Sequence, residues 1–172
     1  MFFCDDVLRE YESDFKWDDA LKYLENVYNR SGSSMVLNTL VGCSWYYLIE
    51  GPIVSRRYAN DPNVAALETW KRYLTIGEQN LSADPYFNFI AGYTLSLNGF
   101  IIGKTYEQKG LTYIERCLSL AEDFMLQKLA ENFLINQGTS RYVTLKNGKQ
   151  ICDQLFSEES LLCEYFREIY GA

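Results

Sequence analysis

The 172-residue sequence predicts an all-α fold of stacked antiparallel helical hairpins, and two observations carry that prediction. Three charged amphipathic stretches, at residues 20–28, 66–74 and 110–118, are variations on one pattern. Two uncharged, aromatic-rich stretches of helical character, at residues 31–49 and 85–103, lie between them. A charged helix that alternates with an apolar one, at a period of roughly 45 residues, is typical of stacked helical hairpins.

Apolar periodicity and stop signals divide most of the chain into helices. Pro62 and Pro85 each follow an aspartate that can cap a helix, so each marks a helix start. Pro52 is expected to end the third helix near residue 49, and Gly138 to stop the seventh. The expected helices cover residues 5–15, 18–28, 33–49, 62–79, 85–97, 106–123 and 124–136.

The C-terminal tail has a different pattern. Residues 142–152 alternate between apolar and polar side chains around Asn147-Gly148, which predicts either a short β-hairpin or an irregular loop. A last helix is expected from Ser157 to Tyr170. The whole chain, residues 1–172, is expected to form a single helical domain.

The charge pattern restricts the class of partner. The formal net charge is −7, and the first 30 residues contain eight acidic side chains against four basic ones. An acidic excess disfavours nucleic acid and anionic membranes as partners, because both are bound through positive charge. A protein with a basic surface fits this charge, although an ordinary solvated acidic surface explains it as well.

Several features predict a cytoplasmic protein without cofactor or metal. The five cysteines are an odd number without a Cys-x-x-Cys motif, which indicates reduced thiols rather than disulfides or a zinc site. The N-terminus lacks the basic and apolar regions of a signal peptide. The two uncharged stretches contain too many Ser, Thr, Asn and Gly residues for membrane-spanning helices, so buried central helices are expected instead.

The sequence also argues against an enzyme. It contains no histidine, which removes the commonest general base and the usual partner of Ser and Cys nucleophiles. Adjacent carboxylates such as Asp18-Asp19 point about 100° apart on a helix and do not form an acid–base pair. No phosphate-binding glycine motif precedes either Gly-Lys pair.

Two resemblances add to these inferences. Residues 84–123 resemble a tetratricopeptide helix–turn–helix, with Phe89, Gly92 and Tyr93 in the first helix and Gly-Leu-x-Tyr-Ile-x-x-Cys-Leu from residue 110 in the second. The hairpins are longer than that repeat and lack its Trp-x-x-Leu-Gly start. As a small, acidic, histidine-free helical chain, the protein is also similar to the helical immunity proteins of bacterial contact-dependent growth inhibition and related polymorphic toxin systems.

The second resemblance implies the function. Such an immunity protein binds one cognate toxin domain, frequently a basic nuclease, in a 1:1 complex and occludes its active site. The alternative is a tetratricopeptide-like secretion chaperone or protein-binding adaptor. The expected partner-binding residues are the acidic Glu10, Asp14 and Asp18, with Tyr46 and Tyr93 from the uncharged helices. For the carboxylates the alternative is plain solvation, and for the two tyrosines it is a place in the core.

Overall fold

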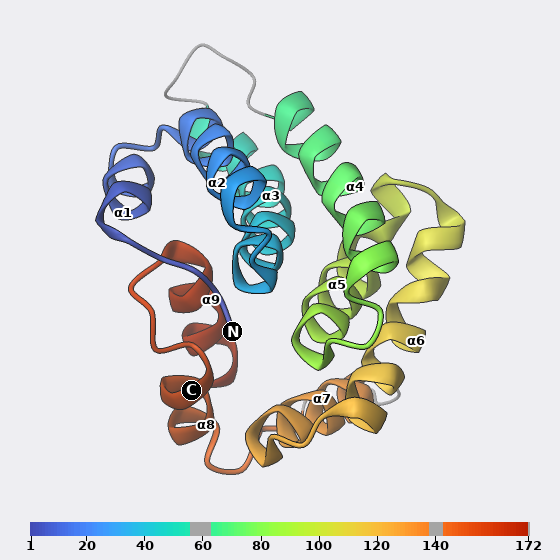
Figure 1. Cartoon of the computed structure of the whole chain (residues 1–172). Coiled ribbons are helices and arrows are strands. Elements are labelled where there is room, and N and C mark those ends of the chain that lie inside the picture. The colour runs from blue at the N-terminus through green and yellow to red at the C-terminus, as the bar shows by residue number, and fades with distance from the viewer. Residues whose placement is uncertain (56–62, 138–142, 172) are drawn as a thin grey trace. The chain divides into compact units, whose positions relative to one another are not determined.

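The computed structural model describes residues 1–55, 63–137 and 143–171, and every regular element within these ranges is helical (Figure 1). The predicted all-α class is therefore confirmed for the described part of the chain. The elements are α1 (Asp6–Ser13), α2 (Trp17–Ser31), α3 (Ser34–Ser55), α4 (Asn63–Asn80), α5 (Pro85–Asn98), the 3-10 turn η1 (Gly99–Ile101), α6 (Lys104–Leu120), α7 (Phe124–Gln137), α8 (Gly148–Leu155) and α9 (Leu161–Tyr170).

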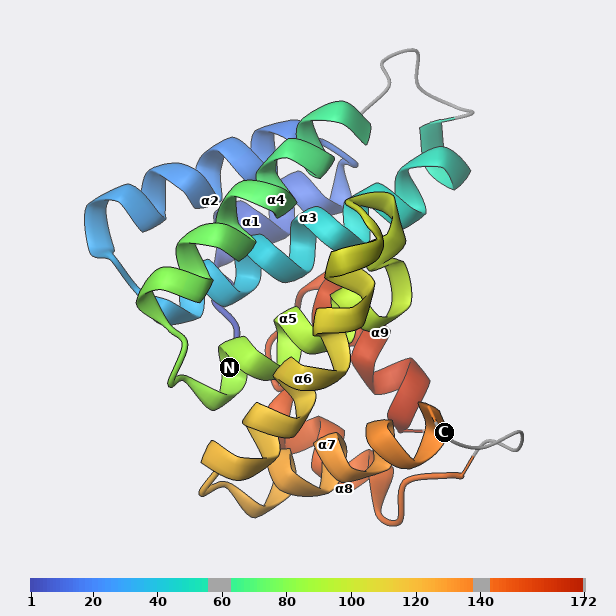
Figure 2. The ribbon, with the colours of Figure 1, turned by 90° about the vertical axis from the view of Figure 1, so that its right-hand side faces the viewer.

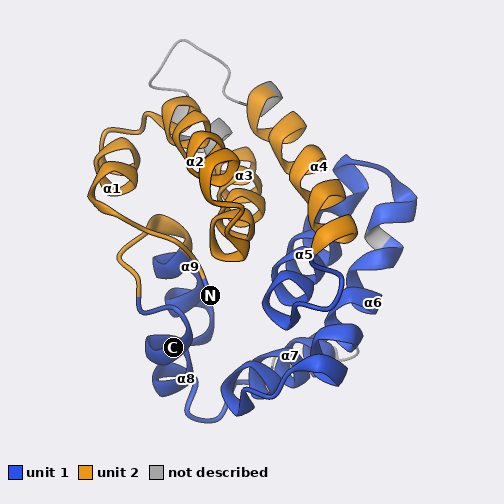
Figure 3. Cartoon of the chain, in the orientation of Figure 1, with its two compact units in different colours: residues 1, 81–157, 163–172 blue, residues 2–80, 158–162 orange. Residues whose placement is uncertain are grey.

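The chain divides into two compact units (Figure 3). Unit 2 comprises residues 2–80 and 158–162 and contains α1 to α4. Unit 1 comprises residue 1, residues 81–157 and residues 163–172, and it contains α5 to α8 and most of α9. Helices adjacent in sequence contact one another within each unit, α1 to α4 in one and α5 to α8 in the other. These consecutive contacts are those of helical hairpins.

In unit 2 helix α3, which carries no charged residue before Glu50, is central. It contacts α2 before it and α4 after it, as both views of the ribbon show (Figures 1 and 2). Leu37, Leu40 and Trp45 are fully buried. The connection from α2 to α3 is short because Gly32 ends α2 in the left-handed conformation, with φ of 61°, and donates its N–H to the Tyr28 carbonyl at 2.8 Å.

In unit 1 the predicted cap of α5 is confirmed, since the Asp84 carboxylate accepts a hydrogen bond from the Phe87 N–H at 2.8 Å. Helices α5 and α6 approach closely where Gly110 faces α5. A Cβ atom added to Gly110 would lie 2.5 Å from the backbone nitrogen of Ser96. The α5–α6 hairpin therefore requires glycine at position 110.

The expected end of the third helix is wrong. Helix α3 continues through Pro52 and ends at Ser55. Pro52 cannot donate a hydrogen bond to the carbonyl four residues earlier, but the φ angle fixed by its ring is close to that of a helix. The expected helix start at Pro62 and stop at Gly138 lie outside the described residues.

The possible β-hairpin at residues 142–152 is not seen. Residues 143–147 are irregular, residues 148–152 belong to helix α8, and residue 142 lies outside the described residues. Asn147 adopts positive φ, 59°, as an Asn-Gly turn favours, but the chain enters a helix after it. The side chain of Asn136 accepts from the Val143 N–H at 2.6 Å and donates to the Val143 carbonyl at 3.1 Å. Because Val143 is satisfied by α7, it needs no second strand.

The last helix begins at Leu161 rather than Ser157. Each helix within the three described ranges is too short or too polar to cross a lipid bilayer. The prediction that residues 1–172 form one domain stays a prediction, because the two units are described separately.

Candidate partner-binding surface

The negative charge of the chain is concentrated in unit 2. Unit 2 contains 14 Asp and Glu residues against 8 Lys and Arg, a formal charge of −6, whereas unit 1 contains 9 against 8, a charge of −1. An approaching cationic protein is therefore attracted mainly to unit 2.

The predicted acidic residues lie on α1, in the turn after it and in the first turn of α2. Glu10 is exposed on α1, and Asp14 is exposed at the C-cap of that helix. The Asp14 carboxylate accepts a hydrogen bond from Lys16 Nζ at 2.7 Å. This bond is the first cause of the raised pKa of Lys16, followed by attraction to Asp14 itself and, more weakly, to Glu10 and Asp19. Asp14 and Lys16 therefore form a local ion pair within this acidic stretch.

Asp18 is less exposed than expected. It is only partly accessible in the first turn of α2, where a carboxylate suits the helix dipole. Its Oδ1 atom is buried and accepts no hydrogen bond from the described residues. Asp18 therefore belongs to the edge of the acidic surface rather than to its exposed centre.

The turn between α1 and α2 contains an exposed aromatic residue, Phe15. Its side chain is 50% exposed, and its φ angle is 56°, in the left-handed region. The Phe15 N–H bonds to the Glu12 carbonyl at 3.1 Å and the Lys16 N–H to the Tyr11 carbonyl at 2.8 Å. This pair of bonds is a Schellman motif, whose left-handed position is usually glycine.

The conformation of Phe15 has an energetic cost. A bulky side chain in the left-handed region costs about 1–2 kcal/mol. Its ring gains about 0.5–1.5 kcal/mol from the tilted contact with Trp17, whose ring centroid is 6.2 Å away. The contact with Trp17 offsets part of this cost. We define Phe15, Glu10, Asp14, Asp18 and Asp19 as the α1–α2 surface.

The two predicted tyrosines differ. Tyr46, on α3, is partly accessible, and its ring centroid lies 6.5 Å from that of Trp17 in unit 2. Tyr93, on α5, is only 3% exposed, and its hydroxyl lies 2.9 Å from that of Tyr165. Its ring contacts those of other unit 1 residues, Phe89, Phe133, Tyr165, Phe166 and Tyr170. These contacts correct the surface role expected for Tyr93, because a ring with so little exposed area is a core residue.

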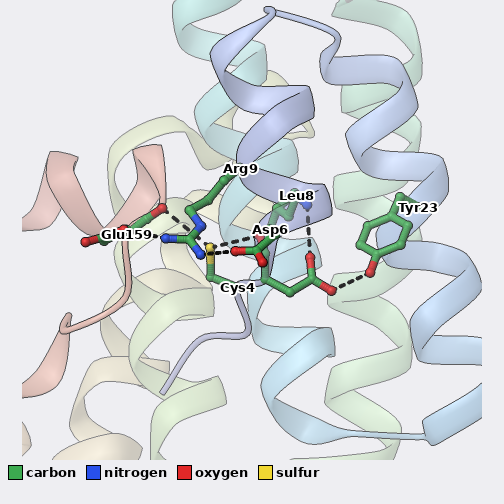
Figure 4. A network of polar contacts seen from close by, with 7 residues as sticks. Cys4, Asp6, Leu8, Arg9, Tyr23 and Glu159 are labelled. Carbon is green, nitrogen blue, oxygen red and sulfur yellow. Dashed lines mark hydrogen bonds and ion pairs between the residues drawn. The ribbon is translucent and has the colours of Figure 1, made fainter.

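A polar network fixes the segment before α1 (Figure 4). Arg9 forms ion pairs with Asp6 and with Glu159, which precedes α9. The Asp5 carboxylate accepts hydrogen bonds from the Leu8 N–H, at 2.9 Å, and from the Tyr23 hydroxyl. Burial, aided by the hydrogen bond to Asp5, raises the pKa of Tyr23 to about 12. These acidic groups are paired within the chain, as Asp14 is with Lys16 and Asp19 with Lys22, whereas Glu10 forms no ion pair with the described residues.

The sequence did not reveal the role of Glu12, a buried carboxylate in unit 2. Glu12 is 3% exposed, and its Oε1 accepts a hydrogen bond from the Tyr47 hydroxyl at 2.7 Å. Its Oε2 accepts from the backbone N–H of Leu161, the first residue of α9, at 3.0 Å. Cys43 Sγ lies 3.9 Å from Oε1. A buried carboxyl group with these partners connects α1, α3 and the start of α9, so its role is structural.

The same group affects the neighbouring phenol. The pKa of Tyr47 is raised well above its ordinary value, first by burial and then by its neighbours Cys43 and Glu12. Tyr47 therefore stays a neutral donor to the Glu12 carboxylate. One sequence signal existed, because Glu12 follows Leu8 by four residues and thus shares the buried face of α1.

The thiols offer little nucleophilic chemistry. Four of the five cysteines are buried, and only Cys4 is partly accessible. Burial raises the pKa of Cys117 to about 12 and that of Cys152 to about 11. Thiolates are the reactive form, so these two residues are poor nucleophiles. Among the described residues, no group of three or more Cys, Asp or Glu side chains is arranged to hold a metal ion.

No protein-family model, no curated protein and no solved structure matches this chain.

Proposed function

We propose that the protein is an immunity protein that binds a cognate toxin domain, a basic nuclease, and neutralises it by covering its active site. The observation that carries the proposal is the α1–α2 surface of unit 2, where half-exposed Phe15 lies in sequence among the carboxylates of Glu10, Asp14, Asp18 and Asp19.

The charge distribution supports the first step, encounter. A nuclease carries positive charge where it binds the phosphates of its substrate, and carboxylates can occupy the same places. With a formal charge of −6 on its residues, unit 2 would attract such a groove over several ångströms at low salt. Fast association suits an inhibitor that must act before its toxin does.

Phe15 supports the second step, tight binding. Binding energy in protein interfaces is concentrated in a few anchors, and aromatic residues at the centre of a polar rim are typical of them. A side chain at a Schellman turn projects from the end of a helix with its backbone already fixed, so little conformational entropy is lost on binding.

The experiment is protection of bacteria that produce the toxin domain encoded in the adjacent reading frame. Wild-type protein should protect these cells and should fail against unrelated toxin domains. The test variant combines Glu10→Lys, Asp14→Lys and Asp18→Asn. The matched control makes the same charge change at exposed positions of unit 1, with Glu115→Lys, Glu122→Lys and Asp153→Asn.

The test variant should associate with the purified toxin domain at least about tenfold more slowly at low salt, and its rate should depend less on salt. If the electrostatic field near α1 is what accelerates association, the association rate of the control variant should stay within about twofold of the wild-type rate. Equal slowing by both variants would assign the effect to net charge and would remove the α1–α2 surface from the proposal. If wild type protects against no adjacent toxin but keeps a secreted protein soluble, the secretion-chaperone alternative replaces this function.

A further inference from the structure

Helix α1 carries apolar side chains on a partly exposed face as well as on its buried one. Val7 and Tyr11 are four positions apart, so they are neighbours on one face of the helix. Val7 is 41% exposed, and Tyr11 is half-buried. The buried face is made by Leu8 and Glu12, which follow them by one position each. The apolar surface of α1 therefore extends beyond the part that the fold covers.

Helix α2 continues this apolar face. The ring centroid of Tyr23 lies 6.1 Å from that of Tyr11, and the Tyr23 hydroxyl donates to the carboxylate of Asp5 just before α1 (Figure 4). Tyr23 is half-buried, as Tyr11 is. Val7, Tyr11 and Tyr23 thus form a connected, partly exposed strip where α1 packs on α2, which we call the apolar seam.

Exposed carboxylates border the apolar seam on both helices. Glu10 and Asp14 follow Val7 by three and seven positions and so lie on the same face of α1. On α2, Asp19 precedes Tyr23 by four positions and lies on its face. All three carboxylates are exposed. An apolar strip between carboxylates complements a partner element that has apolar and cationic side chains together.

The carboxylates are accessible to the cations of a partner. Lys16 Nζ lies 2.7 Å from the Asp14 carboxylate and Lys22 Nζ 3.6 Å from that of Asp19, and all four side chains are at least half exposed. Ion pairs this exposed are weak, so lysines or arginines of a partner can replace Lys16 and Lys22. Glu10 forms no ion pair with the described residues.

The shape of the apolar seam favours a helix as the bound element. Both sides of the seam are helices without a strand edge, which excludes recognition by strand addition. A partner helix with apolar residues at i, i+3 and i+4 presents them as one stripe, and its cations beside that stripe meet the carboxylates. The acidic border ends toward Arg30, two turns beyond Tyr23 on α2, so the seam accommodates only a few turns of a helix.

From the exposed apolar strip and its acidic borders, we propose that the apolar seam binds a cationic amphipathic helix of the partner protein. The apolar stripe of that helix contacts Val7, Tyr11 and Tyr23, and its lysines or arginines pair with Glu10, Asp14 and Asp19. This inference rests on the proposed function and deepens it, because it names the element of the partner that the acidic part of the α1–α2 surface recognises.

The test is an NMR titration of the full-length, ¹⁵N-labelled protein at physiological salt with a synthetic peptide. The peptide is two copies of Leu-Lys-Lys-Leu-Leu-Lys-Leu, acetylated and amidated, whose leucines form one stripe in a helix. Amide signals within residues 5–23 should shift in a saturable manner, with a dissociation constant below about 1 mM. Two control peptides remove one feature each. Glutamate in place of every lysine reverses the charge, and alternating Leu-Lys favours a strand; each should bind at least about tenfold more weakly.

Charge variants locate the acidic border. Glu10→Gln with Asp19→Asn should weaken the lysine peptide at least about fivefold. Glu115→Gln with Asp153→Asn removes the same charge from exposed positions of unit 1 and should leave the affinity within about twofold of wild type. Equal weakening by the two pairs would overturn the proposal, because net charge would then explain the binding.

Apolar variants locate the strip. Val7→Ser should weaken the lysine peptide about threefold or more, because the seam loses apolar area. Leu111→Ser, at a position 39% exposed on α6 in unit 1, is the matched control and should not change the affinity. The ¹⁵N spectrum of each variant shows that it is folded. Equal affinity for the lysine and glutamate peptides, or shifts spread evenly over both units, would overturn the proposal.

The peptide titration and the protection assay fail separately. If the lysine peptide binds at residues 5–23 but the protein protects against no adjacent toxin, the apolar seam stands as a site for a cationic helix and the proposed function fails. If the protein protects its cells but the lysine peptide does not bind, the proposed function stands and the apolar seam is refuted.

Discussion

Replacing Glu12 with alanine should be among the most destabilising single changes on α1. The substitution leaves the Tyr47 hydroxyl and the Leu161 N–H buried without their acceptor. Each unsatisfied donor costs about 1–3 kcal/mol, and the missing side-chain atoms add about 1 kcal/mol for the space they leave. The sum of about 3–7 kcal/mol is a large part of the roughly 5–15 kcal/mol that stabilises a typical domain.

Two further variants separate the contributions. Glu12→Gln keeps one acceptor oxygen and should cost about 1–3 kcal/mol, because only one of the two donors loses its partner. Tyr47→Phe removes one donor and leaves the bond from Leu161 intact, so it should cost about 1.5–3 kcal/mol. If Glu12 and Tyr47 bond in solution, their substitutions should not be additive. The Glu12→Gln, Tyr47→Phe double variant should be destabilised by about 1–2 kcal/mol less than the sum of the two single variants.

The assay is urea unfolding followed by tryptophan fluorescence. All three tryptophans, Trp17, Trp45 and Trp70, lie in unit 2, so this signal reports on the unit that contains Glu12. Glu10→Ala, on the same helix but exposed, is the control and should change the free energy of unfolding by less than about 0.5 kcal/mol. A cost below about 1 kcal/mol for Glu12→Ala would refute the structural role of this carboxylate.

Three other outcomes follow from the packing. Gly110→Ala should destabilise unit 1 by about 1–3 kcal/mol or more in thermal unfolding, because the new Cβ would meet the Ser96 backbone. Under native conditions at pH 8, Cys4 should react with a thiol reagent well before Cys117, because Cys117 is buried and its pKa is about 12; all five thiols should react after denaturation. Tyr86 has its pKa raised to about 12, above the ordinary value of 10, so the folded state holds this proton more tightly than the unfolded chain. Its contribution to stability is complete below pH 10 and is lost between pH 10 and about 12, which comparison of wild type with Tyr86→Phe across that range should show.

Periodicity predicted the helices well where a helix has one buried face or a strong cap. The start of α5 is an example, because Asp84 and Pro85 define it through neighbouring residues only. The burial of α3 could also be predicted from the sequence. A 19-residue stretch without charge has no polar face to turn toward water, so it is expected in the interior of a helical protein.

The errors arose where distant residues decide the local conformation. From its sequence neighbours alone, Gly148 is predicted to lie in a hairpin turn. A Cβ at this position would lie 2.0 Å from the carbonyl oxygen of Tyr170, so it is packing against the C-terminal end of α9 that requires glycine here. The sequence predicted Tyr93 to line a groove because a phenol can face water. In the structure its hydroxyl bonds in the core to that of Tyr165, which lies 72 positions later in the chain. Glu12 likewise depends on Leu161, which lies 149 positions away.

For the α1–α2 surface too, one part could be predicted from the sequence and another could not. The acidic run in the first 30 residues is visible in the sequence and predicts where a cationic partner would approach. The left-handed conformation of Phe15 is not visible, because nothing in Asp14-Phe15-Lys16 resembles the glycine that normally occupies such a turn. The only sequence signal for this conformation was that the short connection between α1 and α2 contains no glycine.

Phe15→Gly provides the most direct test of the central claim, measured as the affinity of the purified protein for the adjacent toxin domain. Glycine suits the left-handed position and removes the ring, and the free energy of unfolding measured beside the affinity shows that the variant is folded. If Phe15 anchors the partner, affinity should nevertheless fall by about thirtyfold or more, the loss expected for an interface residue worth about 2 kcal/mol. Unchanged affinity in a folded Phe15→Gly protein would contradict the claim that the α1–α2 surface binds the toxin.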